Sequence, residues 1–314
     1  MTHIYLPEGR RLNSPANRRA MADVDGLTQA MRSGHILESV ALCCTPEHDL
    51  LVEMGPFTGV IPRSEAAPGI AQGSTREIAI LSRVGRAVSY VVTGLDTAPD
   101  GSLRPILSRR LAQERVLTHY LNRLRPGDIL PATVTHLEPF GAFVDIGCGL
   151  VSMIGIEHIS VSRIPHPSAR FRPGQEIFVV VSGLDPEHRR VLLTHRELLG
   201  TWQENAVQFA PGMTVPGHIR GVRDYGLFVE LAPNLSGLAE YRDDLADNER
   251  VSVYIKSILP ERMKLKLLII DRLPPLKAPE PLRYFRTEGH ISRWQYAPEG
   301  CLKQGAVTEF DAAE

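Results

Sequence analysis

Two stretches of this chain repeat one pattern of aromatic, glycine and apolar residues. Residues 138–147 read EPFGAFVDIG, and residues 223–232 read RDYGLFVELA. Each stretch lies in a longer repeat that begins with Pro-Gly and ends in a strand, a polar turn and another strand. Repetition of this kind indicates tandem copies of one structural unit. Four to five short strands in about 70 residues, separated by Gly and Pro, predict that the unit is a small all-β barrel.

A third, degenerate copy is predicted before these two. Residues 33–65 contain the same order of strand, turn, strand and glycine, and residues 86–110 supply a closing hairpin with Asp100-Gly101 as its turn. The chain is thus predicted to be mainly β, with barrels joined by short α-helices. We predict five parts: an N-terminal helical segment (1–32), a degenerate barrel with a linker helix (33–124), a barrel with a linker helix (125–209), a further barrel (210–272), and a proline-rich linker with a small β tail (273–314).

Helical periodicity is expected between the barrels. Residues 109–124 place apolar side chains near a 3.6-residue period and stop before Pro126. Residues 196–209 are predicted to form a similar helix that ends before Pro211, and a short helix is expected near residues 17–34. The tail is predicted to contain a strand pair.

The residues around Phe143 indicate which side of their strand faces the core. Side chains alternate between the two faces of a strand, so Val144 and Ile146 share one face and Phe143 and Asp145 share the other. An aspartate is expected to face water, which places Val144 and Ile146 in the core and Phe143 on the wet face.

By the same alternation in residues 226–232, Phe228 and Glu230 are expected to face outward, and Leu227, Val229 and Leu231 to face the core. Phe140 and Tyr225 precede the two phenylalanines by three residues. A bulge or kink at Gly141 and Gly226 would bring each pair of rings to one side. Exposed ring pairs hold single-stranded nucleic acid by stacking on its bases. The alternative is that the rings belong to the core or seal a contact between barrels.

These residues resemble a known family, the RNA-binding domain named after bacterial ribosomal protein S-one, which is a five-stranded OB-fold barrel. The resemblance is carried by PGDILPATVTHLEPFGAFVDIG (126–147), EHIS (157–160) and GLDPEHRRVLLTHREL (183–198) in the second copy. In the third copy it is carried by PGMTVPGHIRGVRDYGLFVEL (211–231), SGLAEY (236–241) and PERMKLKL (260–267). The first copy matches only by pattern, through residues 50–65 and 107–110. The helix after residue 195 and the tail resemble those of short, multi-repeat relatives.

The resemblance implies an RNA-binding face made of two aromatics, a histidine and a basic residue near the last hairpin. The matching residues of the second copy are Phe140, Phe143, His158 and Arg190, with Arg189 and Asp185 beside it. The rings would stack on bases and the arginines would contact phosphate. Taken alone, His158 could be a surface histidine, and the arginines could belong to a solvated turn.

The third copy keeps Tyr225 and Phe228, and Lys264 stands near the arginine position. Glu240 occupies the histidine position, where a carboxylate would repel phosphate, so this barrel is expected to bind more weakly or to hold the RNA along a shifted path. Arg220 and Arg223 on the neighbouring strand are candidates to compensate.

In the first copy, Leu51 and His48 take the two ring positions. This barrel is therefore expected to dock onto a protein or to brace the other two.

Composition and motifs narrow the class of protein. A net charge of −1 argues against a polycationic protein that coats DNA. The four cysteines form no CxxC pair and indicate free thiols in a reducing cytosol. No apolar run is long enough to span a bilayer, so a cytoplasmic protein with no membrane partner is expected. Phosphate-binding loops, catalytic triad motifs and metal-ligand spacings are absent from the sequence. A solvated loop is expected at the acidic residues 243–249.

The sequence therefore predicts a non-catalytic protein with no cofactor, no metal and no small-molecule substrate. Its expected partners are single-stranded RNA, including mRNA, and the small ribosomal subunit, with a role in translation. Two alternatives stay open at this point: an RNA-binding accessory of a nuclease or regulatory complex, and a protein-interaction scaffold that binds no RNA.

Overall fold

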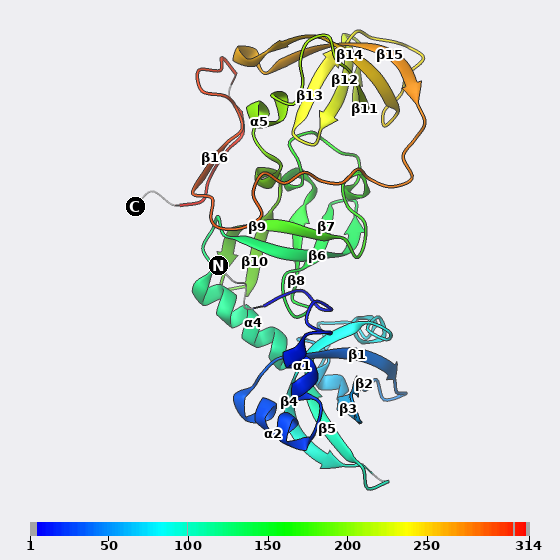
Figure 1. The fold of residues 1–314 in the computed structure, drawn as a ribbon, viewed down its shortest axis with the longest axis vertical. Coiled ribbons are helices and arrows are strands. Elements are labelled where there is room, and N and C mark those ends of the chain that lie inside the picture. Colours follow the sequence, from blue (N-terminus) through cyan, green and yellow to red (C-terminus); the bar gives the residue numbers. More distant parts are fainter. Residues whose placement is uncertain (1–4, 99, 304, 312–314) are drawn as a thin grey trace.

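The computed structural model describes residues 5–98, 100–303 and 305–311, and it contains three closed five-stranded barrels in chain order (Figure 1). In each barrel the third and fifth strands pair in parallel and the other neighbours are antiparallel. The predicted fold class is therefore confirmed. None of the helices in the described residues is both long and apolar enough to cross a membrane.

The first barrel is preceded by two short helices in place of the one that was expected. These are α1 (Pro15–Ala20) and α2 (Val24–Ser33). The chain breaks between them because the Asp23 side chain accepts a hydrogen bond from the Gly26 N–H and starts a new helix. The barrel strands are β1 (Leu37–Cys44), β2 (Leu50–Met54), β3 (Phe57–Ile61), β4 (Ala87–Thr97) and β5 (Leu103–Ser108), with η1 (Arg63–Glu65) and α3 (Ile78–Leu81) between β3 and β4.

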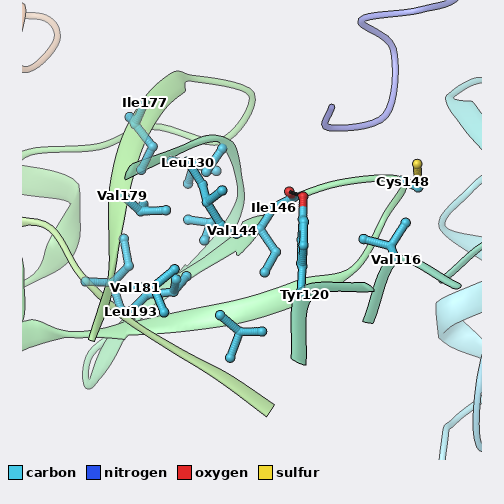
Figure 2. Packing of buried hydrophobic residues seen from close by; sticks show 14 of the residues in the cluster. Val116, Tyr120, Leu130, Val144, Ile146, Cys148, Ile177, Val179, Val181 and Leu193 are labelled. Atoms are coloured by element: carbon cyan, nitrogen blue, oxygen red, sulfur yellow. Dashed lines mark hydrogen bonds between the residues drawn. The ribbon is translucent and has the colours of Figure 1, made fainter. Parts of the chain in front are cut away.

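The hydrophobic cluster of the second barrel extends through one helix to the first barrel, which has a core of its own. Its strands are β6 (Ile129–Glu138), β7 (Gly141–Asp145), β8 (Val151–Gly155), β9 (Glu176–Asp185) and β10 (Arg190–Thr194), with η2 (Ile156–His158) and η3 (Pro167–Ala169) after β8. The predicted helix is α4 (Arg109–Arg123), and it places Val116 and Tyr120 against the barrel core around Val144 and Ile146 (Figure 2). Ile36 and Val91 of the first barrel join the same cluster.

The third barrel consists of β11 (Thr214–Arg223), β12 (Gly226–Ala232), β13 (Leu235–Ala239), β14 (Arg250–Leu259) and β15 (Lys264–Leu273), with η5 (Pro260–Arg262) between the last two. The single helix predicted over residues 196–209 is wrong, because the segment forms η4 (Arg196–Leu199) and α5 (Trp202–Ala206). Gly200 separates them with a φ of +80°, and a Cβ at this position would lie 2.6 Å from the Phe285 ring. A capping box of Thr201 and Glu204 then starts α5.

The predicted strand pair of the tail is present as β16 (Arg293–Gln295) and β17 (Val307–Glu309). It packs on the second barrel, where Ile291, Trp294 and Phe310 form a cluster with Ile129 and Val180. The tail is therefore an integral part of the fold.

The expectation that Asp145 and Glu230 face water is wrong, since both side chains are buried at junctions between barrels. Asp145 accepts a hydrogen bond from the backbone N–H of Glu8, whose carboxylate pairs with Arg109. Burial and the Glu8 carboxylate raise the pKa of Asp145 to about 7. Alternation locates the outer face of a strand correctly, but it does not show which part of that face another segment of the chain covers.

Candidate nucleic-acid interface

The outer face of the second barrel presents a row of flat and apolar side chains that are exposed or half-buried. Phe143 lies at its centre on β7, with His136 of β6 and Met153 of β8 as its register partners. The His136 and Phe143 rings stack with centroids 4.2 Å apart and planes 7° from parallel. Val144 on the opposite face is fully buried, so Phe143 lies on the predicted side.

Phe140 reaches this face from a tight turn. Glu138 pairs with Gly141, so Pro139 and Phe140 form the two-residue connection between β6 and β7. The Phe140 ring is 56% exposed and meets Phe143 edge-on, with centroids 6.1 Å apart and planes at 83°.

The predicted bulge at Gly141 is wrong. The register shift lies on β6, between Val134 and His136, and the hairpin turn is what brings the two rings together. Gly141 is needed for another reason, because a Cβ there would lie 2.5 Å from the Ile154 carbonyl oxygen.

The third barrel repeats this arrangement closely. Tyr225 occupies the turn between β11 and β12 and is 64% exposed, while Phe228 on β12 is 36% exposed. Their centroids lie 6.2 Å apart with planes at 87°. The register shift is again on the preceding strand, between Ile219 and Gly221, so the bulge predicted at Gly226 is also wrong. Gly226 has a φ of +151°, and a Cβ there would lie 2.5 Å from the Ala239 carbonyl oxygen.

The other predicted residues of the second barrel do not all converge. His158 in η2 lies by the end of β10, where its carbonyl accepts from the His195 N–H, and the adjacent Ile156 N–H donates to the Phe140 carbonyl. His158 is thus near the Phe140 end of the face. Arg190 is exposed at the opposite end of β10 and shares its outer face with the exposed Leu192.

Asp185 and Arg189 belong to the β9–β10 turn. The Asp185 carboxylate accepts a hydrogen bond from the His188 N–H at 3.0 Å, and this bond lowers the pKa of Asp185. The carboxylate thus caps the turn. Arg189 has a φ of +53° and lines a separate cavity against α4, together with Tyr5 and His119. The cavity that Arg189 lines contains neither Phe140 nor Phe143.

The third barrel carries more cationic side chains beside its rings than were predicted from the sequence. A groove of about 670 Å³ runs past Tyr225 and Phe228 and is lined by four lysines: Lys256, Lys264, Lys266 and Lys303. Lys266 follows Lys264 on the outer face of β15, an alternation visible in the sequence. Lys303 comes from the tail, which is held beside the β14–β15 turn by a hydrogen bond from the Leu302 N–H to the Glu261 carbonyl at 3.0 Å.

Glu240 also lines this groove, but it is not an isolated negative charge. Lys256 donates to its carboxylate at 2.9 Å, and this hydrogen bond lowers the pKa of Glu240. The expected weakness of the third barrel rested on Glu240, and its pairing with Lys256 removes that reason.

Arg220 and Arg223 lie on the other side of the rings. Together with Arg163 of the second barrel they line an adjoining groove of about 440 Å³ that also contains Tyr225 and Phe228. Arg223 is exposed.

In the first barrel the two ring positions hold Leu51 and His48, and His48 pairs with Glu77 at 3.3 Å. No group of three or more His, Cys, Asp or Glu side chains in the described residues is arranged to hold a metal ion.

A closed five-stranded barrel with this strand order and an aromatic outer face defines the chain as a tandem OB-fold protein. Residues 123–196 match the family described as S1 RNA binding domain. This match confirms the resemblance inferred from the sequence for the second barrel.

Curated relatives agree with this assignment. The chain is 29% identical over 244 residues to small ribosomal subunit protein bS1 of Leuconostoc lactis, with 72% of this chain and 54% of that protein covered. It is 30% identical over 192 residues to the bS1 homolog of Bacillus subtilis (strain 168), with 60% and 48% covered. The chain thus spans about half the length of the curated relatives it matches.

A solved structure from Streptococcus pneumoniae, described as a multidomain protein with nucleic acid binding domains, covers 77% of this chain and 75% of its own. Its TM-score is 0.26 and its sequence identity 14%.

Proposed function

We propose that this chain is a non-catalytic, cytoplasmic protein that binds single-stranded RNA through the outer faces of its second and third barrels. The observation that carries the proposal is the repeated ring pair. Phe140 and Tyr225 are exposed in equivalent turns, and Phe143 (half-buried) and Phe228 (36% exposed) follow them at equivalent strand positions. The two ring pairs have almost the same mutual geometry. Hydrophobic packing alone gives no reason for two barrels to expose equivalent rings, whereas stacking on unpaired bases does.

Phosphate contacts are the second part of the proposed mechanism. In the second barrel Arg190 is exposed on the outer face of β10, at the end away from Phe140. In the third barrel Lys264 and Lys266 line the groove beside Phe228. Cations so placed would pair with the backbone of an RNA strand whose bases rest on the rings. Two such faces on one chain would raise the overall affinity through effective concentration.

The first barrel is proposed to brace the second. Glu8 of the N-terminal segment pairs with Arg109 of α4 at 2.9 Å, and its N–H donates to Asp145 of β7 at 2.7 Å. The two barrels also share core residues. This contact would hold the second barrel in a fixed orientation.

RNA binding is tested by measuring the affinity of the full chain for an unstructured single-stranded RNA by fluorescence anisotropy. Phe143→Ala and Phe228→Ala are each expected to weaken binding by about 1–3 kcal/mol. Tyr254→Ala is the matched control, because Tyr254 is 38% exposed on β14, a strand that is not paired with β12. If both phenylalanine variants bind as well as the parent, the stacking mechanism is wrong.

A place in translation is supported by the relatives, whose name describes a protein of the small ribosomal subunit. We propose that the chain assists mRNA at that subunit. Sedimentation of a cell extract tests this, since the chain should travel with small subunits. If it travels instead with a nuclease or regulatory complex and not with subunits, it is an accessory of that complex.

A second candidate function is favoured by the apolar character of the second barrel's face. Val151, Met153 and Leu192 are exposed there beside Phe143, and a protein partner could cover them. In that case Phe143→Ala would leave RNA affinity unchanged while Phe228→Ala lowered it.

A further inference from the structure

A cavity of about 490 Å³ lies between the second and third barrels. Its walls are the β11–β12 part of the third barrel, the η3 loop of the second barrel, and the proline-rich segment 275–283. Figure 1 shows this segment as the extended orange-red chain that leaves β15 and crosses between the two barrels. The cavity is separate from the groove that contains the four lysines.

One carboxylate at this junction serves two guanidinium groups. Glu230 accepts hydrogen bonds from Arg170 of the second barrel and from Arg220 of the third, the latter at 3.3 Å. Arg170 is only 3% exposed, and burial lowers its pKa. Two largely buried cations share this one anion, so the three groups together carry a net positive charge.

The rest of the lining increases this excess. The cavity is lined by five basic side chains, Arg170, Arg220, Arg250, Lys277 and Arg283, against two carboxylates, Glu230 and Glu280. Glu280 pairs with Arg250 at 3.8 Å. The five positive and two negative charges give a formal excess of three.

Two of these arginines also have unused donors. The Nε atoms of Arg170 and Arg250 are buried and have no hydrogen-bond partner among the described residues. An unpaired buried donor costs free energy, and donors attached to a cation are satisfied best by an anionic acceptor.

We propose that this cavity binds a phosphate group. Guanidinium groups match the geometry of phosphate oxygens, and a cavity of this size is in the range of small-ligand sites. The phosphate would belong either to an RNA backbone or to a free nucleotide. Arg220 lines both this cavity and the groove beside Phe228, so a strand on the ring face is close to one entrance. The site itself does not depend on base stacking by Phe228.

Isothermal titration of the full chain with inorganic phosphate at low ionic strength tests the proposal. Arg250→Gln and Lys277→Gln are each expected to weaken phosphate binding by about tenfold, since each removes a charge-assisted contact. Both positions leave the Arg170–Glu230–Arg220 contacts intact. Arg242→Gln is the matched control, because Arg242 is exposed and pairs with Asp244 outside the cavity. Absence of phosphate binding by the folded parent, or equal binding by the Arg250→Gln/Lys277→Gln double variant, would overturn the proposal.

Competition identifies the source of the phosphate. Displacement of phosphate by a single-stranded RNA oligonucleotide would assign the cavity to the RNA backbone. Displacement by AMP but not by RNA would assign it to a free nucleotide. Phe228→Ala should leave phosphate binding unchanged, so failure of the ring mechanism and failure of this site give different results.

Discussion

The imidazole of His136 lies parallel to the ring of Phe143, with centroids 4.2 Å apart. The two residues come from neighbouring strands of the second barrel and are register partners. Each ring restricts the rotamers of the other, so the face offers a flat surface that is ordered before the proposed RNA ligand binds. Such preorganisation reduces the entropy lost on binding.

The stack predicts a graded response to substitution of His136. His136→Ala should weaken single-stranded RNA binding by about 0.5–1.5 kcal/mol, because Phe143 must then be ordered by the ligand. His136→Phe keeps a flat ring and should retain the parent affinity. Anisotropy titrations of both variants check this, and equal losses in the two would show that the imidazole acts by its polarity and not as an ordering ring.

Salt dependence should separate the cations that face the rings from those that do not. Arg190→Gln is expected to reduce the slope of log K against log salt by about 0.7, the value for one phosphate contact with a single strand. Arg189→Gln is the neighbouring control and should leave the slope unchanged, because Arg189 lines a different cavity. Titrations at several salt concentrations measure the slopes. An equal reduction of the slope in both variants would contradict the prediction that Arg190 contacts phosphate and Arg189 does not.

The stability of the junction between the first two barrels is expected to depend strongly on the Glu8 carboxylate. Its carboxylate accepts two hydrogen bonds from Arg109, at 2.9 and 3.0 Å, and both side chains are buried. Glu8→Gln is expected to lower the free energy of unfolding by about 3–5 kcal/mol, because Arg109 is left as a buried charge without its partner. Urea unfolding followed by circular dichroism measures this.

A matched comparison for Glu8 is the surface pair of Arg10 and Glu176, at 3.2 Å, in which Glu176 is 68% exposed. Glu176→Gln should cost less than about 1 kcal/mol. A similarly small loss in Glu8→Gln would show that the buried pair is not what joins the two barrels.

Buried His195 should make stability fall in mild acid. Its Nδ1 contacts the Ile159 carbonyl at 2.7 Å and its Nε2 contacts the Tyr284 hydroxyl at 3.0 Å, an arrangement that suits the neutral ring. Burial lowers the pKa of His195 to about 4 from 6.5. Between pH 4 and pH 6.5 the unfolded chain binds a proton that the folded chain does not. The stabilisation that neutral His195 gives the folded chain is therefore complete above pH 6.5 and is lost as the pH falls toward 4.

The loss expected from His195 is up to about 3 kcal/mol. It is measured as the difference in unfolding free energy between the parent and His195→Gln, at pH 7 and at pH 4.5. This comparison cancels the pH effects of the other titrating groups, which the two proteins share. A difference that does not shrink at the lower pH would mean that His195 is protonated in the folded chain.

Local pattern was sufficient to predict much of this structure. Strict alternation around Val144 and Val229 predicted the barrel strands and the outward faces of Phe143 and Phe228, because the pleat of a strand follows from a few consecutive residues. The 3.6-residue period ending before Pro126 predicted α4, and the Pro-Gly starts predicted the repeats. Lys266 could have been found in the same way, from its alternation with Lys264.

Contacts between distant segments decided what local pattern could not. Asp145 and Glu230 occupy outward positions, yet they are buried because Glu8 and Arg170, 137 and 60 residues away, cover and pair with them. Gly200 ends η4 because Phe285 packs against it. Lys303 reaches the rings of the third barrel only because the tail folds back beside η5. Backbone alternation is a property of neighbouring residues. Burial and charge compensation depend on which remote segments come into contact, and these contacts are determined only by the tertiary structure.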